Sequence, residues 1–405
     1  MTIAMNASGS LIEMEEKFGA HNYHPLDVVL AKGEGIYVWD VDNKRYMDFL
    51  AAYSAVNQGH NHPRIVKALI DQAGTLALTS RAFRNDRFPP LLKKLNALTG
   101  FDKALLMNSG AEAVETAIKA ARKWGYEVKG IPANTAEIIV FTGNFHGRTS
   151  TIISFSDDEV TTGHFGPFTP GFHLAEYGNL DNVRSLVNDR TCAIMVEPIQ
   201  GEGGVVVPEK GFLKGLRDIC DQHQILLFTD EIQSGLGRTG TLFAFEHEGI
   251  RPDGVTIGKA LSGGIYPVSA FLANDAVMDV FTPGTHGSTY GGNPLACAVA
   301  EAALDVLVEE HLIERSAELG AYLIDQVRAI DSPHVKEVRG KGLWIGLELH
   351  PQAGGARRFC ERLQEEGLLC KETHTHTIRL APPLIISKEE LDWAIGKVAL
   401  VLKEA

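Results

Sequence analysis

The 405-residue sequence lacks features that would place it in whole classes of protein. No uninterrupted apolar run approaches the roughly 20 residues of a membrane-spanning helix, so a membrane protein is not expected. Basic residues are outnumbered, because 38 Lys and Arg stand against 51 Asp and Glu and give a net charge of −13. A nucleic-acid or anionic-membrane partner is therefore not expected either.

Cysteine is also scarce, with five residues and no Cys-x-x-Cys pair. An odd number at wide spacing fits reduced thiols in a cytoplasmic compartment better than a disulfide framework. The histidine pairs at 60/62 and 374/376 have no acidic or sulfur partners at ligand spacing, so no metal site is predicted. Residues 1–20 contain no arginine and no apolar core, which argues against a secretory signal or a transit peptide.

Hydrophobic residues make up 44% of the chain, enough for large buried cores, and the length suits one large and one smaller domain. From about residue 100, short apolar segments alternate with helical patterns such as those at 111–126 and 212–223. This alternation predicts an α/β fold with a mainly parallel central sheet that helices cover on both faces. The predicted strands are 104–107, 138–141, 151–155, 192–196, 225–228, 255–257 and 268–272.

Three parts are expected along the chain. Residues 1–50 form an N-terminal segment with a hairpin around Asp42-Asn43, and this segment packs with the C-terminal part. Residues 51–295 form the large domain. Residues 296–405 form a smaller α/β domain, whose last helix opens with the capping box Ser387-Lys388-Glu389-Glu390.

One lysine, Lys259, ends a β-branched run and precedes the paired glycines 263–264. Apolar surroundings lower a lysine pKa, and the neutral amine can form a Schiff base with a carbonyl. To be half neutral near pH 7, its pKa must fall roughly 3 units from about 10.4, which corresponds to about 4 kcal/mol. From this segment alone, a solvent-exposed lysine just beyond a strand is more common than a buried, neutral one.

Two other strand ends carry polar residues. Asp230-Glu231 follows a buried strand, where an acidic side chain is costly unless it is paired. One interpretation is a structural ion pair or a helix cap. The other is a carboxylate that holds a cationic ring nitrogen. Ser109 and Glu112 match a capping box at the start of the helix 111–126. The free amides at this helix start also suit a phosphate group.

Further candidates lie in loops and in the C-terminal part. Phe145 follows the strand 138–141 and can stack on a flat cofactor, and Arg148 can bind a carboxylate with two hydrogen bonds. Arg379 has apolar neighbours, so it is either stacked on the surface or paired in a cleft. Glu202, in a glycine-rich loop, is by default a solvated acid.

Together these motifs resemble the class III pyridoxal-phosphate aminotransferases of fold type I, from about residue 19 to the last helix. The matching segments, in the family's order, are Asn108-Ser109-Gly110, Phe145-His146-Gly147-Arg148, Glu197-Pro198, Asp230-Glu231-Ile232-Gln233, Lys259 and the run from Gly287 to Pro294. Within the class, the sequence looks most like the ornithine δ-aminotransferases. The segments 21–26, 53–60, 78–83 and 121–126, outside the shared cofactor motifs, carry this closer likeness.

The resemblance implies pyridoxal 5′-phosphate as the cofactor. Lys259 is expected to bind it covalently and then to carry a proton, while Asp230 pairs with its ring nitrogen. Phe145 and Ile232 are expected to cover the two ring faces, and Gln233 to contact the ring hydroxyl.

The resemblance also implies a homodimer, or a higher oligomer, with active sites at the subunit interface. Thr289 is expected to reach the phosphate from the second subunit. The residues expected around the phosphate are Ser109, Gly110, Ala111, Ser288 and Thr289. His146 is expected to be cofactor-binding as well, at a position where animal ornithine enzymes tend to carry tryptophan.

For substrates, the resemblance implies L-ornithine and 2-oxoglutarate in a ping-pong transamination that yields glutamate 5-semialdehyde and glutamate. Tyr23 and Arg148 are expected to hold the far end of ornithine, and Arg379 the α-carboxylate of glutamate. Glu202 is expected to cover Arg379 while ornithine binds, and Tyr53 to shape the pocket. The alternatives are an N-acetylornithine or 4-aminobutyrate aminotransferase, an aminomutase of the same class, and a non-catalytic homologue.

Overall fold

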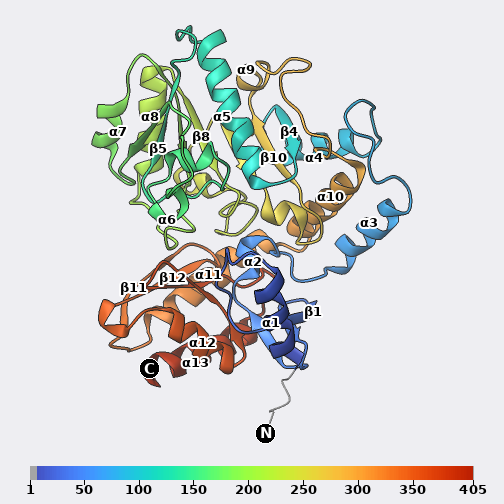
Figure 1. The fold of residues 1–405 in the computed structure, drawn as a ribbon, viewed down its shortest axis with the longest axis vertical. Helices are drawn as coiled ribbons and strands as arrows, with labels where there is room; N and C mark the ends of the chain where they lie inside the picture. The colour runs from blue at the N-terminus through green and yellow to red at the C-terminus, as the bar shows by residue number, and fades with distance from the viewer. Residues whose placement is uncertain (1–6, 405) are drawn as a thin grey trace.

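The computed structural model describes residues 7–404, and its largest element is a seven-stranded central sheet (Figure 1). The strand order is β4-β10-β9-β8-β7-β5-β6. β10 runs antiparallel to both of its neighbours, and the other neighbouring strands are parallel, so the predicted mainly parallel sheet is confirmed. The bounds are β4 Lys103–Met107, β5 Glu137–Phe141, β6 Phe172–Ala175, β7 Thr191–Val196, β8 Leu226–Asp230, β9 Gly254–Ile257 and β10 Ser269–Ala273.

Both faces of this sheet are buried, because side chains along each strand alternate between two hydrophobic clusters. In β5, Ile138 and Val140 belong to one cluster and Ile139 and Phe141 to the other. The first cluster contains the apolar face of α5 Gly110–Glu127, and the second contains that of α8 Phe212–His223. The near-continuous apolar strands of the sequence therefore reflect helices on both sides.

The C-terminal part forms a second, antiparallel sheet in the order β11-β12-β15-β14. A third sheet joins the N-terminal hairpin to it, since β13 pairs in parallel with β3 through Leu368 and Met47. In Figure 1 these parts lie together below the central sheet. The strands are β1 Leu30–Glu34, β2 Tyr37–Asp40, β3 Arg45–Asp48, β11 Val335–Gly340, β12 Ile345–Leu349, β13 Leu368–Leu369, β14 Lys371–Thr373 and β15 Thr377–Leu380.

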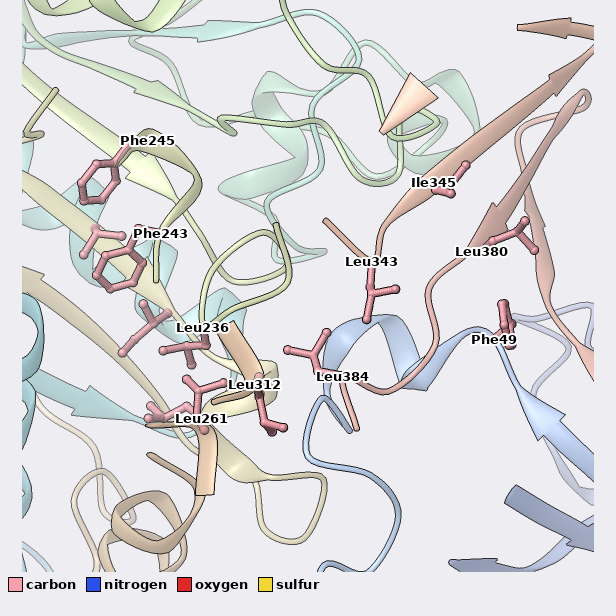
Figure 2. Packing of buried hydrophobic residues seen from close by; sticks show 14 of the residues in the cluster. Phe49, Leu236, Phe243, Phe245, Leu261, Leu312, Leu343, Ile345, Leu380 and Leu384 are labelled. Atoms are coloured by element: carbon pink, nitrogen blue, oxygen red, sulfur yellow. The ribbon is translucent and has the colours of Figure 1, made fainter. Parts of the chain in front are cut away.

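One hydrophobic cluster runs from the central sheet into the C-terminal part. Figure 2 shows Leu384 between Leu236 on one side and Leu343 on the other. The buried Arg238 reinforces this contact, because its Nη1 donates to the carbonyl oxygens of Leu343 (2.8 Å) and Pro382 (2.7 Å).

The remaining helices and short helical turns complete the cover of the sheets. They are α1 Ala7–Phe18, α2 Ala51–Ser54, α3 Pro63–Ala73, α4 Phe88–Thr99, η1 Ile152–Phe155, α6 Glu159–Thr162, α7 Leu180–Leu186, η2 Ala244–Glu248, η3 Lys259–Ser262, α9 Asp275–Met278, α10 Pro294–Glu309, α11 Leu312–Arg328, η4 Pro351–Ala353, α12 Arg357–Glu365 and α13 Lys388–Glu404. Within residues 7–404, no helix is both long and apolar enough to cross a bilayer.

The predicted strand at 151–155 is wrong, because this segment forms the 3-10 helix η1. Thr149 starts the turn by accepting the amide of Ile152 at its hydroxyl (3.2 Å). Both edges of β5 are already paired, with β6 and β7, so a strand here would have no partner in that position. The apolar side chains of η1 belong instead to the hydrophobic cluster under α5.

The short α2 segment is left-handed. Its four residues Ala51, Ala52, Tyr53 and Ser54 have φ angles of 49°, 45°, 59° and 73°. This conformation costs a non-glycine residue about 1–2 kcal/mol, because Cβ approaches the next carbonyl oxygen. Asp48 stabilises the entry, since its Oδ1 accepts the amides of Leu50 (2.8 Å) and Ala51 (3.0 Å).

Replacing the exposed Ala52 with glycine should therefore stabilise the fold. Ala52→Gly removes the Cβ strain and adds the backbone entropy of glycine, for a net gain of about 0.5–1 kcal/mol. The matched control is Ala321→Gly at an exposed position within α11, which should lose about 1 kcal/mol. Urea unfolding of both variants measures these changes, and an equal loss in both would contradict the strain at Ala52.

Candidate active site

One cavity of about 210 Å³ collects the residues that follow four parallel strands. The carboxyl ends of parallel strands meet at one edge of a sheet, where ligands bind in such folds. Gly110 comes after β4, Phe145 after β5, Asp230 ends β8 and Lys259 follows β9. The full lining is Gly110, Ala111, Phe145, His146, Gly147, Glu197, Ile199, Asp230, Ile232, Gln233, Ser234 and Lys259. Eight of the residues predicted for the cofactor therefore meet in one place.

Lys259 opens η3 with a positive φ of 43°, and its carbonyl oxygen accepts the hydroxyl of Ser262 (2.7 Å). The pKa of its ammonium group lies below the usual value, chiefly because burial removes water from the charged form. The carboxylates of Glu202 and Asp230 oppose this shift, and the guanidinium of Arg379 adds to it. A lowered pKa favours the neutral amine, which is the form that can act as a nucleophile or a base.

Both oxygens of the buried Asp230 carboxyl group accept hydrogen bonds. Its Oδ2 accepts Nδ1–H of His146 (2.6 Å), and its Oδ1 accepts the hydroxyl of Thr256 (2.9 Å) and the amide of Ile232 (3.1 Å). Desolvation lowers the pKa of His146, but the hydrogen bond and the charges of Asp230 and Glu197 outweigh it, so the pKa is raised. These three donors fix the orientation of the Asp230 carboxyl group at the cavity wall.

The adjacent Glu231 behaves in the opposite way. Burial raises its pKa to about 7, although it accepts the hydroxyl of Ser234 (2.5 Å) and the amide of Phe245 (3.0 Å). Burial likewise raises the pKa of Glu197 to about 7. Glu197 accepts the amides of Phe145 (2.9 Å) and Gly201 (3.4 Å), and so fixes the backbone on two sides of the cavity.

The cavity is shaped for a flat, phosphorylated ring. Phe145 and Ile232 both line it, and a Cβ on Gly110 would lie 3.0 Å from Ile232 Cδ1, so only glycine leaves this space open. At its end, the predicted capping box of α5 is present: Ser109 Oγ accepts the amide of Glu112, whose Oε2 accepts the amide of Ser109. The amides of Gly110 and Ala111 precede the Glu112 amide that Ser109 caps, and they are available to a phosphate.

These features fit pyridoxal phosphate. The phosphate fits the start of α5 beside Gly110 and Ala111, and the ring fits between Phe145 and Ile232. A protonated ring nitrogen fits Asp230, whose carboxyl group lines the cavity. In addition, Nε2 of His146 is buried and has no hydrogen-bond partner among the described residues, so it is a polar atom left for a group bound in the cavity.

Glu202 and Arg379 form a closed ion pair close to this cavity. Arg379 Nη1 lies 2.6 Å from Glu202 Oε1, and the arginine side chain is only 3% exposed. The guanidinium also packs over the Tyr53 ring, 4.7 Å from its centroid. Thr373 donates its hydroxyl to the carbonyl oxygen of Glu202 (2.6 Å), which fixes the loop to β14.

The other predicted residues lie around the cavity and do not line it. Tyr23, 79% exposed, shares a second cavity of about 490 Å³ with Tyr53. Arg148 is exposed, and its guanidinium lies 5.5 Å from the centroid of Phe145. Ser288 Oγ accepts Nδ2 of Asn108 (2.9 Å), and Thr289 is exposed.

Sequence reasoning assigned no role to Thr256 or Tyr177. Thr256 is the register partner of Asp230 across β8 and β9, so strand pairing, once known, identifies it. Tyr177 is half-buried and donates to the carbonyl oxygens of Glu197 (3.0 Å) and Pro198 (3.1 Å). No local pattern marked Tyr177, which belongs to a segment that follows the unpredicted strand β6.

Comparison with known proteins agrees with this geometry. Residues 18–402 match the family model described as aminotransferase class-III. A Brevibacillus brevis protein named ornithine aminotransferase is 54% identical over 398 residues, which cover 98% of this chain and 99% of that protein. The crystal structure of an ornithine aminotransferase from Toxoplasma gondii has a TM-score of 0.97 at 43% identity and covers 98% of this chain and 96% of its own. An acetylornithine aminotransferase from Elizabethkingia anophelis has a TM-score of 0.91 at 53% identity, with coverage of 98% and 99%.

The raised pKa of Glu231 makes stability depend on pH. Its folded pKa, about 7, lies above the unfolded value, so its contribution is complete below about pH 4.5 and is lost as the pH rises through 7. Glu231→Gln keeps an acceptor for Phe245 and cannot ionise. From pH 5 to pH 8, the variant should gain about 2 kcal/mol in unfolding free energy relative to the native chain. Urea unfolding at both pH values tests this, with exposed Glu318→Gln as the control; a pH-independent difference would contradict it.

Proposed function

We propose a specific reaction for this chain, which belongs to the class-III aminotransferase family. It transfers the δ-amino group of L-ornithine to 2-oxoglutarate and yields L-glutamate 5-semialdehyde and L-glutamate in a ping-pong cycle. The aldehyde product can cyclise to pyrroline-5-carboxylate without the protein. The relatives named ornithine aminotransferase support this choice within the family. The structural observation that carries it is the closed Glu202–Arg379 pair close to Lys259.

The enzyme depends on pyridoxal phosphate, as predicted. When bound, the cofactor supplies an aldehyde carbon for the amino group and a protonated ring that accepts the electron pair left at the substrate carbon. Asp230, oriented by His146 and Thr256, would pair with the protonated ring nitrogen. Lys259, whose pKa burial lowers, would accept the proton that Cδ of ornithine loses.

The Glu202–Arg379 pair lets one site accept two kinds of amine. An unpaired arginine would repel the cationic δ-amine of ornithine, and a buried lone guanidinium is costly. With Glu202 in place, the local charge is neutral and ornithine binds through Tyr23 and Arg148. When Glu202 moves away, the guanidinium that packs on Tyr53 is free to bind the α-carboxylate of glutamate or 2-oxoglutarate.

The active enzyme is proposed to be a homodimer, in which Ser288 and Thr289 of one subunit reach the phosphate held by the other. Exposed aromatic side chains at Phe83 (72%) and Tyr290 (51%) support an interface in this region. Residues 51–295 are proposed as the cofactor-binding domain, and 296–405 with the N-terminal segment 1–50 as the smaller unit. The five buried free cysteines support the proposed reducing, cytoplasmic compartment.

A second candidate is transfer from N-acetylornithine, since the Elizabethkingia anophelis relative of that name is 53% identical. The two substrates differ in the α-nitrogen, which is a cationic amine in ornithine and an uncharged acetamide in the acetylated form. The rival substrate would therefore need an additional acyl pocket beyond Tyr23 and Arg148.

A single-turnover absorbance experiment tests the proposal. The yellow holoenzyme is mixed separately with L-ornithine, N-acetylornithine and 4-aminobutyrate, without a keto acid. We expect rapid loss of the yellow absorbance with ornithine alone and its return on addition of 2-oxoglutarate. The control, Lys259→Ala, should bind the cofactor without catalysing repeated turnover. Equal or faster bleaching by N-acetylornithine would assign the second function, and turnover without any keto acid would indicate an aminomutase.

The charge of Glu202 should control substrate choice. Glu202→Gln keeps an acceptor for Arg379 but leaves its charge exposed to the substrate. We expect kcat/KM for ornithine to fall roughly 10- to 100-fold and that for glutamate to be unchanged or higher. The control is Glu209→Gln, an exposed acid in the same connection. Parallel half-reaction kinetics measure both values, and an unchanged ratio of the two would refute the gate.

A further inference from the structure

The loop 282–290 carries Ser288 and Thr289 but is largely exposed. Its first part folds on itself, because Thr285 Oγ1 accepts the amide of Thr282 (3.1 Å) and donates to its carbonyl oxygen (2.7 Å). A Cβ on Gly287 would meet no atom within 4 Å. The residues that contact phosphate in our proposal therefore need to be held from outside the loop.

His286 provides one such attachment, to the second turn of α5. Its Nδ1 lies 2.9 Å from Lys119 Nζ and its Nε2 lies 2.8 Å from Thr116 Oγ1. The ring also stacks on Phe281, with centroids 5.5 Å apart and planes at 25°. Three contacts thus fix the orientation of the imidazole.

The chemistry of the partners sets the protons on this ring. The Lys119 ammonium can only donate, so Nδ1 must accept and the proton of the neutral ring is on Nε2. Nε2–H then donates to Thr116 Oγ1, whose own hydroxyl donates to the carbonyl oxygen of Glu112 (2.7 Å). Desolvation lowers the pKa of His286, the charge of Lys119 lowers it further and Glu112 opposes them, which agrees with a neutral ring.

A second attachment lies two residues further along. Ser288 Oγ accepts Nδ2 of Asn108, and the Asn108 amide donates to Glu112 Oε2 (2.9 Å). Both attachments therefore lead to the first three turns of α5 in the same subunit, whereas Thr289 is proposed to reach the phosphate that the partner subunit holds. Thr289 follows directly after the second attachment, so His286 and Ser288 together define where it points.

We infer that His286 is a positioning residue, which acts through Thr289 by fixing the loop 282–290 to α5 and so strengthens cofactor binding. Its neutral ring connects Lys119 and Thr116, and it touches neither the substrate nor the cofactor. This role rests on the proposed contact of Thr289 with the cofactor phosphate. It differs from a merely structural role, because its loss should weaken cofactor binding only while Thr289 is present.

A double-mutant cycle on cofactor affinity tests this inference. The apoenzyme is titrated with pyridoxal phosphate, with no amino substrate, for the native chain, His286→Ala, Thr289→Ala and the double variant. We expect each single variant to bind about tenfold more weakly and the double variant to bind no more weakly than Thr289→Ala. Losses that multiply in the double variant would overturn the inference.

Two further variants guard against misfolding. His286→Gln offers one acceptor and one donor in similar places, so it should retain most of the affinity for pyridoxal phosphate. A loss of affinity equal to that of His286→Ala would overturn the hydrogen-bond account. Lys119→Met removes the bond to His286 and also the bond from Lys119 to the carbonyl oxygen of Thr285 (3.2 Å), so it should weaken cofactor binding as well; no loss would contradict the account.

The outcomes separate this inference from the proposed function. An effect of Thr289→Ala without one of His286→Ala refutes the role of His286 alone. No effect of Thr289→Ala refutes the proposed phosphate contact and the inference together. Failure of ornithine turnover, with the cycle as expected, refutes only the substrate assignment.

Discussion

The structure around the cavity depends on the cost of placing charge at the carboxyl edge of a buried sheet. A charged group there must find a partner or give up its charge, because little water remains to solvate it. Asp230 is paired with His146, Arg379 is paired with Glu202, and the pKa of Lys259 is lowered towards the neutral amine. The three outcomes differ because the neighbouring groups differ.

The adjacent acids Asp230 and Glu231 show that the same constraint affects two neighbouring residues differently. Asp230 accepts hydrogen bonds from an imidazole and from two further donors. Glu231 points to the other side of the strand end, where a hydroxyl and one amide are its partners and its pKa rises to about 7. Asp230 thus lines the cavity, and Glu231 fixes the turn that carries Ile232 and Gln233.

Much of this arrangement was predictable, because it depends on local pattern. The apolar strands, the capping box at Ser109 and Glu112, and the lysine after a β-branched run are all visible within short segments, and they were confirmed as elements of the fold. The segment 151–155 was not predictable in this way. Its apolar, β-branched composition suits a strand, but β6, which the sequence does not mark clearly, pairs with β5 in its place.

The sequence by itself determined the fold class, the family and the candidate residues, because periodicity and motif order are properties of neighbouring positions. Only the tertiary structure decided which of these residues pair with one another and how their surroundings shift their pKa values. Glu202 and Arg379 are 177 positions apart, and His146 and Asp230 are 84 apart, so both pairings depend on how distant segments pack together. Protonation follows from burial and from these partners, and both exist only once the distant segments have packed together.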